Sequence, residues 1–266
     1  MDLQLLVICI LTFVIHLIGT LAYAVRIAGI RTRRIAISFA LFNILILVSR
    51  TSNTFQGPFL AKRIENNISH GISNGLLADF RWLLFSASFA TVVGAILIPT
   101  FQRAFSRAVL HFHIHRSVPR LLLHGFFKGG LSQFKDLMRL PAVENVTRLE
   151  RRAIPPQVVT LNVAAVALWT VGVFAALYAG YLNPELRVTA STLSSVINGV
   201  ATIMMFVFID PQMSIMTDDV MEGKVSEPQF RRAVVWLVGS RFAGTLAAQF
   251  ALVPAAMLVA TVARVV

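Results

Sequence analysis

The apolar segment LQLLVICILTFVIHLIGTLAYAV runs from Leu3 to Val25, and none of its 23 residues is Asp, Glu, Lys or Arg. A helix needs about 20 apolar residues to cross ~30 Å of hydrocarbon, so this segment predicts a membrane-spanning helix. A signal peptide is not favoured, because Asp2 precedes the segment where a cationic region is expected, and basic residues follow it at Arg26 and Arg31. We expect the helix to be retained.

Four more charge-free runs are long enough to span a membrane, at 82–102, 153–184, 188–209 and 242–263. A sixth run, 35–49, would give only about 22 Å of helix and must continue through Arg50 toward Pro58 to cross. We therefore predict an all-α polytopic membrane protein forming one transmembrane domain over residues 1–266. Its expected spans lie near 3–25, 35–58, 82–102, 157–182, 188–209 and 236–263.

The composition agrees with a membrane protein. Hydrophobic residues make up 56% of the 266-residue chain and charged residues only 14%, which excludes a soluble globular enzyme. The net charge of +12 fits nucleic acid or an anionic membrane surface equally, and the apolar runs decide for the membrane, with no nucleic-acid partner. Cys9 is the single cysteine, so there is no disulfide framework and no cysteine metal site.

The distribution of Lys and Arg predicts the orientation. The first, third and fifth connections of a six-helix arrangement hold seventeen basic residues, against six in the remaining connections and ends. Cytoplasmic loops carry the excess of Lys and Arg, so we expect both termini outside. The long middle connection divides the helices three and three, and the halves would enter the membrane from opposite sides, as in inverted-repeat transporters.

The middle connection, about 103–152, holds ten basic and three acidic residues. Apolar residues recur within it at helical spacing, at Leu123, Phe127, Leu131, Phe134 and Met138. This pattern predicts a basic amphipathic helix in the cytoplasmic headgroup layer, where anionic membrane lipids would be its partners. The alternative is a solvated cytoplasmic loop.

Arg50 is the residue that most strongly indicates a functional site, because it lies within a predicted span. Placing an arginine at the centre of a spanning helix costs about 2.5 kcal/mol or more on insertion scales. Ser49, Ser52 and Asn53 surround it with hydrogen-bonding side chains, which favours a polar lining facing a cavity. The alternative is that Arg50 lies near the outer end of a tilted helix and reaches headgroup phosphate.

A second arginine, Arg241, begins a polar stripe with Thr245 and Gln249 at steps of four, and Gly244 beside it permits close helix contact. The alternative places Arg241 at the cytoplasmic interface as an anchor, which is also the simplest role for Arg26. In the first span, His16 would titrate, hold a ligand or form structural hydrogen bonds.

No motif for catalysis, a cofactor or a metal is present: there is no nucleophile elbow, phosphate-binding loop, dinucleotide fingerprint or metalloprotease helix. We therefore expect a protein that is not an enzyme. Intramembrane cations without intramembrane anions would attract an anionic guest. A guanidinium group matches phosphate oxygens in a bidentate fork, which favours a phosphorylated or pyrophosphorylated amphiphile.

The chain resembles the Amj family, the alternate lipid II flippases of bacteria. The strings that carry the resemblance are HLIGTLAYAVRIAGIRT (16–32), LFN (41–43), SRTSN (49–53), DPQMSIMTDDV (210–220), GSRFAGT (239–245) and VPAA (253–256). The resemblance implies a flippase of the bacterial cytoplasmic membrane. It would move the peptidoglycan precursor lipid II, linked to undecaprenyl pyrophosphate, from the inner to the outer leaflet during cell-wall synthesis.

Two other functions remain as alternatives: an integral-membrane enzyme acting on a polyprenyl phosphate lipid, and a membrane scaffold for cell-wall enzymes. For the flippase, the predicted headgroup contacts are Ser49, Arg50, Ser52, Asn53 and Arg241, with Arg26 and His16 as further contacts. A homo-oligomer is compatible with the sequence.

Overall fold

The computed structural model describes residues 2–70, 75–115, 137–141 and 154–266. Within these residues, six helical segments are long and apolar enough to cross a membrane. They are α1 (Leu3–Thr32), α2 (Ile35–Ser69), α3 (Leu76–His115), α7 (Pro156–Leu182), the broken segment Pro184–Met221 and α11 (Glu227–Val265). The chain is therefore a multi-pass membrane protein, and the predicted all-α fold is confirmed.

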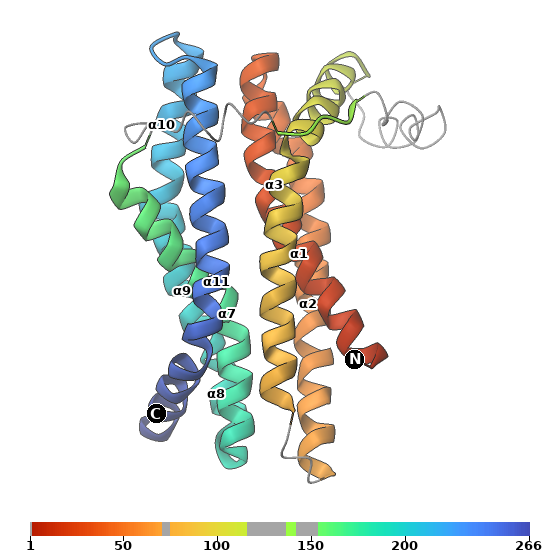
Figure 1. Cartoon of the computed structure of the whole chain (residues 1–266), viewed down its shortest axis with the longest axis vertical. Helices are drawn as coiled ribbons and strands as arrows, with labels where there is room; N and C mark the ends of the chain where they lie inside the picture. Colours follow the sequence, from red (N-terminus) through yellow and green to blue (C-terminus); the bar gives the residue numbers. More distant parts are fainter. Residues whose placement is uncertain (1, 71–74, 116–136, 142–153) are drawn as a thin grey trace.

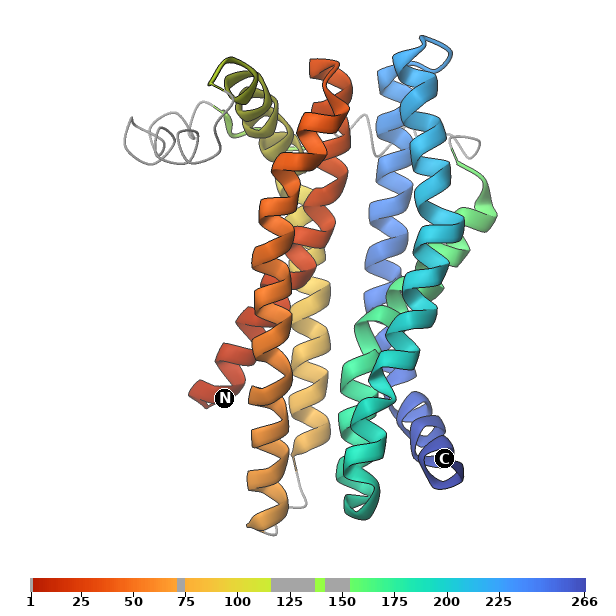
Figure 2. The same cartoon turned by 180° about the vertical axis from the view of Figure 1, so that it is seen from behind.

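The six segments form two groups of three that lie side by side (Figures 1 and 2). In the N-terminal half, α1 packs against both α2 and α3, and in the C-terminal half α7 packs against α11 and the broken segment. The first helix of each half thus holds the other two together. The two halves run in opposite directions, because α1 and α7 start at opposite ends of the bundle (Figure 1).

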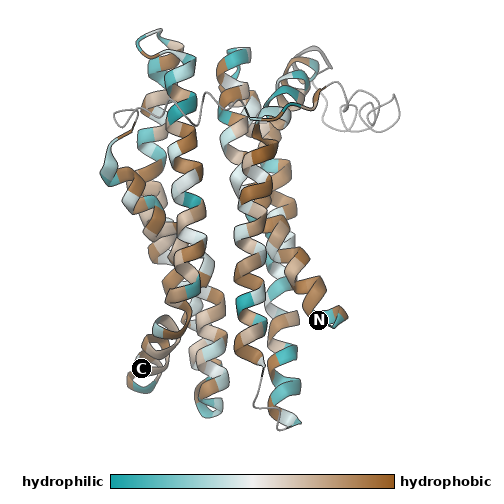
Figure 3. Cartoon of the chain, viewed as in Figure 1, coloured by the Kyte–Doolittle hydropathy of each residue, from teal (hydrophilic) through white to brown (hydrophobic). Residues whose placement is uncertain are grey.

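One end of the bundle collects basic residues, and we call it the basic end. Here α1 and α3 finish and α2 and α11 begin, with Arg31, Arg33, Arg34, Arg103, Arg107, Lys224, Arg231 and Arg232. Apolar colour covers most of each helix between the two ends, and hydrophilic colour gathers toward the ends (Figure 3). This separation is the one that a bilayer imposes on spanning helices.

Side-chain and backbone caps set the helix ends. The Asp2 carboxylate accepts a hydrogen bond from the Leu5 N–H at 2.8 Å, which satisfies a donor left free in the first turn of α1. α11 begins with a capping box in which Ser226 and Gln229 bond reciprocally. Between α1 and α2, Arg33 takes a left-handed conformation (φ 54°) that turns the chain within two residues.

The fifth crossing is broken into short helices. It comprises η1 (Pro184–Leu186), α8 (Arg187–Thr192), α9 (Ser194–Met204), the π-helical turn η2 (Met205–Ile209) and α10 (Asp210–Met221). Pro211 explains the wide turn, because its ring nitrogen donates no hydrogen bond to the carbonyl of Val207 and its ring crowds that carbonyl. The break places Asp210 at the start of α10, facing the N-terminal half.

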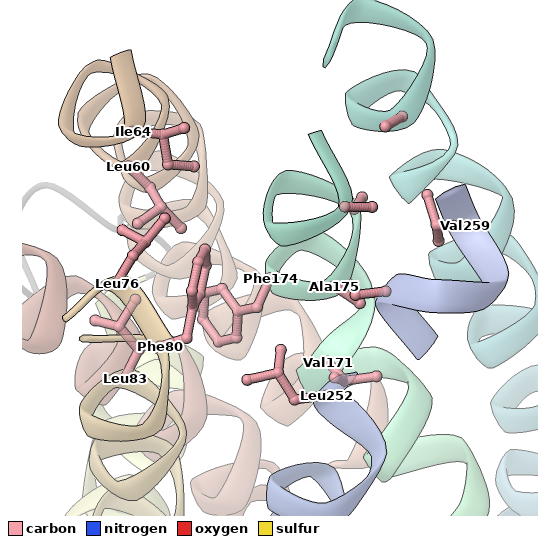
Figure 4. Packing of buried hydrophobic residues seen from close by; sticks show 14 of the residues in the cluster. Leu60, Ile64, Leu76, Phe80, Leu83, Val171, Phe174, Ala175, Leu252 and Val259 are labelled. Atoms are coloured by element: carbon pink, nitrogen blue, oxygen red, sulfur yellow. The ribbon is translucent and has the colours of Figure 1, made fainter. Parts of the chain in front are cut away.

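Apolar clusters close the interface between the halves near both ends. Away from the basic end, Phe80 of α3 meets Phe174 of α7 with ring centroids 6.0 Å apart, among Leu60, Leu83 and Leu252 (Figure 4). A second cluster at the basic end joins the second half of α1 to α7, α10 and α11, and it includes Ala24, Ile27, Val158, Met213 and Phe230.

Glycine permits the closest helix contacts. A Cβ at Gly244 of α11 would lie 2.7 Å from the Val163 carbonyl oxygen of α7, and one at Gly94 of α3 would lie 2.8 Å from Cβ of Thr20 of α1. Any larger residue would force these helices apart. The close contact that the sequence predicts at Gly244 is confirmed.

Most helices extend beyond the spans predicted from charge-free runs. α2 passes through Arg50 and continues to Ser69, and α3 continues to His115, so residues 103–115 of the predicted middle connection are helical. The predicted amphipathic helix of that connection, from Leu123 to Met138, lies outside the described residues except for its last two, Leu137 and Met138. α11 bends in its last part, where Pro254 interrupts the helical hydrogen bonds (Figure 1).

Candidate functional site

Polar residues form a stripe along α1 where it faces the other helices. Thr12, His16, Gly19, Tyr23 and Arg26 follow one another at steps of three or four, which places them on one face. We call these five residues the polar stripe. These residues contact different neighbouring helices, and the stripe lies between the two apolar clusters.

A small cavity lies beside the first part of the stripe. It has a volume of about 40 Å³ and is lined by residues of α1, α2, α7 and α9, among them His16, Asn53, Gln56, Thr170 and Asn198. Gln56 of α2 donates a hydrogen bond to the Thr12 hydroxyl, which ties α2 to the stripe. The lining therefore mixes polar and apolar side chains and comes from both halves.

Two lining groups hold buried polar atoms without a hydrogen-bond partner among the described residues, namely Nδ1 of His16 and Oδ1 of Asn198. A buried polar atom costs free energy unless it is paired, so these atoms are suited to a polar guest. Asn53 and Trp169, which also line the cavity, are exposed, so the cavity reaches the surface between α2 and α7.

Arg241 lies at the next level of the stripe. Its side chain comes from α11 in the C-terminal half, only 9% of its surface is exposed, and its guanidinium lies against Gly19 of α1. No ion pair joins Arg241 to a carboxylate in the described part of the chain, and its Nε has no described hydrogen-bond partner. The interior between the halves thus contains a buried positive charge close to His16 and Tyr23.

The burial of Arg241 differs from the interfacial-anchor alternative. The polar residues that follow Arg241 on the same face of α11 also make contacts within the protein: Thr245 is fully buried, and Gln249 donates a hydrogen bond to the Arg81 carbonyl of α3 at 3.0 Å. α11 therefore presents its polar face to the N-terminal half.

Tyr23 continues the stripe with a polar link between the halves. Its side chain lies close to the side chain of Asn162 in α7. The Asn162 Nδ2 donates to Oγ of Ser240 at 2.7 Å and to the Leu237 carbonyl at 3.1 Å, both in α11. Three helices thus meet at one buried amide.

Arg26 ends the stripe toward the basic end. Its Nη2 lies 3.3 Å from Oδ1 of Asp210, and its guanidinium lies 5.1 Å from the centre of the Phe39 ring. A second ion pair, Arg31 Nε to Glu227 Oε1 at 2.7 Å, joins α1 to α11. Arg26 therefore links the two halves through Asp210.

The group predicted around Arg50 is divided by the structure. Asn53 lines the cavity, and Ser52 is buried with its hydroxyl donating to the Val48 carbonyl. Arg50 is exposed and Ser49 half-buried, and neither lines the cavity. Arg50 and Ser49 precede Asn53 by three and four residues, so they lie near its side of α2.

Sequence reasoning missed Thr12, Gln56, Tyr23 and Asn162. The spacing of 12, 16, 19, 23 and 26 was a readable signal, because a repeated step of three or four marks one helical face. Asn162 stands among mostly apolar residues and Gln56 follows a run of polar residues, so in both cases only the packing shows the partner. Among the described residues, no cluster of His, Cys, Asp and Glu could hold a metal ion.

A family model described as "Amj: Alternate to MurJ" matches residues 11–263, nearly the whole chain. The chain belongs to this family. A curated relative within it, "Lipid II flippase Amj" of Bacillus subtilis (strain 168), is 38% identical over 258 residues, which cover 97% of this chain and 96% of the relative. No solved structure matches the chain.

Membership of Amj confirms the resemblance based on the sequence strings. The matched residues 11–263 include both halves and at least most of each spanning segment, so they contain the polar interior. The polar stripe of α1, Arg241 and the cavity therefore belong to the part of the chain that defines the family match.

Proposed function

We propose that this Amj-family protein is a flippase that moves lipid II from the inner to the outer leaflet of a bacterial cytoplasmic membrane. The observation that carries the proposal is the 38% identity over nearly the full length of both chains to a protein named lipid II flippase. A transporter function agrees with an interior that holds a buried cation and unpartnered polar atoms.

The physical task is to carry a large polar headgroup through hydrocarbon. Polar groups lose their hydrogen bonds to water on entering an apolar phase, which makes unassisted crossing prohibitive. The polar stripe, Asn162 and Asn198 offer hydrogen-bonding groups between the two apolar clusters. The described cavity of about 40 Å³ is much smaller than the ~300–1,000 Å³ of ligand sites, so α2 and α7 must move apart to admit the headgroup. An opening between them would let the prenyl chain remain in lipid while the headgroup occupies the interior.

In this mechanism Arg241 is the main contact for the pyrophosphate, because a guanidinium binds phosphate oxygens in pairs. His16 and Asn53 are proposed as contacts for the sugar and peptide parts at the cavity. Arg50, with Ser49 and Ser52, is proposed to meet the headgroup on the α2 side, and Arg26 to meet it at the basic end.

We place the basic end in the cytoplasm and both termini outside. Support comes from the clustering of basic residues where α1, α3 and α10 finish. Two ion pairs and an apolar cluster close this end, and aromatic packing around Phe80 and Phe174 closes the other. The described state is therefore closed at both ends of the bundle, and transport requires each end to open in turn.

The test is rescue of a bacterium depleted of its other lipid II flippases, with surface labelling of lipid II as the direct measurement. The wild type should restore growth and labelling, Arg241→Ala should reduce labelling at least tenfold, and Arg241→Lys should fall between them. Arg264→Ala, which removes an exposed arginine from the same helix, is the matched control and should behave as the wild type.

Failure of the wild-type protein to restore labelling, at normal membrane abundance, would refute the flippase function. Full labelling with Arg241→Ala would refute the site and leave the function intact. Incubation of the purified protein with undecaprenyl pyrophosphate distinguishes an enzyme, because a carrier leaves the lipid chemically unchanged.

A further inference from the structure

A second, larger pocket lies at the basic end, away from the interior site. Its volume is about 520 Å³, within the range of about 300–1,000 Å³ typical of ligand sites. α1 contributes Arg31 and Thr32, and α3 contributes Arg103, Ser106 and Arg107. We call it the basic pocket.

Positive charge dominates the described lining of the basic pocket. Three arginines line it, and none of the lining residues that the structure describes is acidic. Arg103 and Arg107 form no ion pair or hydrogen bond with any described residue, whereas Arg31 is paired through Nε with Glu227. Like charges that face one volume repel each other, so this arrangement is stabilised when an anion enters.

The geometry of the lining favours phosphate over other anions. Residues 103, 106 and 107 are spaced i, i+3 and i+4, which puts two guanidinium groups and a hydroxyl on one face of α3. Guanidinium forks bind phosphate oxygens in pairs. The Ser106 hydroxyl lies on the same face and donates its own proton to the Gln102 carbonyl at 2.7 Å, so the two arginines are the phosphate donors.

Apolar side chains complete the lining, which points to an amphiphile. Leu110 lines the pocket one turn beyond Arg107 and is 48% exposed, and Leu137 closes it from a separate segment. That segment, residues 137–141, is fastened to α3 because the Thr100 hydroxyl bonds both the N–H and the carbonyl of Arg139. Exposed apolar side chains, including Phe89, Val92 and Ile96, lead along α3 to the pocket. A headgroup bound in the pocket would therefore leave its chain beside this apolar surface, in the bilayer.

We propose that the basic pocket binds the phosphate headgroup of a membrane lipid, as a docking site separate from Arg241 and the interior cavity. Two lipids share this chemistry: a polyprenyl pyrophosphate, which would dock here before transport, and a resident anionic phospholipid. The first assignment rests on the proposed function and the second does not. Binding through phosphate is common to both.

The direct experiment measures lipid binding to the purified full-length protein in nanodiscs of phosphatidylcholine, by native mass spectrometry. Undecaprenyl pyrophosphate and phosphatidylglycerol are titrated separately, with undecaprenol as the probe that lacks phosphate. The wild type should bind at least one phosphate lipid at least tenfold more tightly than undecaprenol. Which lipid binds more tightly identifies the source.

The decisive variant is Arg103→Gln/Arg107→Gln, which should weaken binding of that lipid at least tenfold. Its matched control is Arg33→Gln/Lys224→Gln, which removes the same charge from exposed positions at the same end and should change binding less than twofold. Equal binding by the wild type and Arg103→Gln/Arg107→Gln would overturn the proposal. So would an equal loss in the control pair, because the effect would then be general surface charge.

A second measurement keeps both pocket arginines and so does not depend on the folding of the double variant. Ser106→Cys, in a Cys9→Ser background, is labelled with a soluble maleimide. Undecaprenyl pyrophosphate or phosphatidylglycerol should slow labelling at least fivefold and undecaprenol should not. Unchanged labelling with both phosphate lipids would overturn the proposal, whatever the result of the flipping assay in cells.

Discussion

Gly19 of α1 lies directly against the guanidinium of Arg241 of α11, across the interface between the two halves. A Cβ at position 19 would overlap Nη2 of Arg241 and lie 3.2 Å from its Cζ. The buried arginine therefore occupies the space that a side chain at position 19 would fill. This contact couples the first helix to the last at the level of the proposed pyrophosphate contact.

Gly19→Ala should displace the Arg241 guanidinium, lowering the free energy of unfolding by about 1–3 kcal/mol, typical of overpacking, and reducing lipid II labelling in the rescue assay. The matched control is Gly239→Ala, because the space around Gly239 in α11 is open and alanine favours a helix there. Thermal unfolding of the purified variants measures the difference. In an Arg241→Ala background, Gly19→Ala should lower the free energy of unfolding much less. An equal decrease in the two backgrounds would show that Gly19 and Arg241 are not coupled.

Most of the fold could be predicted from the sequence because a bilayer permits little else. Backbone groups in hydrocarbon must be paired within a helix, so each apolar run of sufficient length specifies a spanning helix. The helix ends were predicted less well. Beyond the hydrocarbon, caps and water satisfy the backbone, and α2 continues to Ser69 through residues that no hydropathy argument requires.

The site could be predicted only in part, because one helix does not reveal which face meets which neighbour. The spacing of Arg241, Thr245 and Gln249 indicates a polar face and leaves an interfacial anchor as the alternative, whereas the contact of Arg241 with Gly19 depends on how α11 packs on α1. Arg50 shows the converse: apolar residues surround all faces of α2, so its exposure was not readable. The break before Asp210 had a signal in Pro211, whose missing N–H disturbs the preceding turn.

The Arg63 guanidinium holds the start of α1 at the end away from the basic end, which predicts a dependence of stability on pH. Its Nη1 lies 2.6 Å from Oδ2 of Asp2, and its Nε lies 2.7 Å from Oδ2 of Asp79. The Leu5 N–H and the Arg63 guanidinium hold the pKa of Asp2 below its usual value of 3.8. A lowered pKa means that the charged carboxylate stabilises the folded state.

This contribution is complete above the usual pKa of Asp2 and is lost as the pH falls through the lowered value. The melting temperature of the wild type should therefore exceed that of Asp2→Asn at pH 6, and the gap should narrow as the pH falls below about 4. Thermal unfolding in one detergent across this range makes the comparison. A gap that stays constant with pH would show that the charge of Asp2 contributes nothing.

The Arg26–Asp210 ion pair should restrain opening at the basic end. Asp210→Asn removes a partly exposed ion pair that contributes at most about 1 kcal/mol. The population of molecules with an open basic end should therefore rise by up to about fivefold. The reporter is Met213→Cys in a Cys9→Ser background, because Met213 is buried one turn beyond Asp210. Its labelling rate with a membrane-impermeant maleimide should rise.

Asp218→Asn is the matched control for this gate, because Asp218 is exposed on the same helix and forms no ion pair with a described residue. It should leave the labelling rate of Met213→Cys unchanged. The exchanged pair Arg26→Asp/Asp210→Arg should restore slow labelling. If the exchanged pair labels as fast as Asp210→Asn, then the charge pairing does not hold this end closed.

Filling the cavity should separate transport from stability. Val173 of α7 lines the cavity and is only half-buried, so Val173→Phe can place its ring in the open volume without displacing a packed neighbour. A ring there would occupy the space beside His16 and Asn198 that we assign to the headgroup. Lipid II labelling should fall at least tenfold, while the melting temperature and membrane abundance stay near those of the wild type.

Val196→Phe is the matched control for the cavity variant. It makes the same exchange on the exposed face of α9, where 60% of the valine surface is exposed, and should transport normally. Normal labelling with Val173→Phe would show that the headgroup takes another path, because a blocked cavity carries no headgroup.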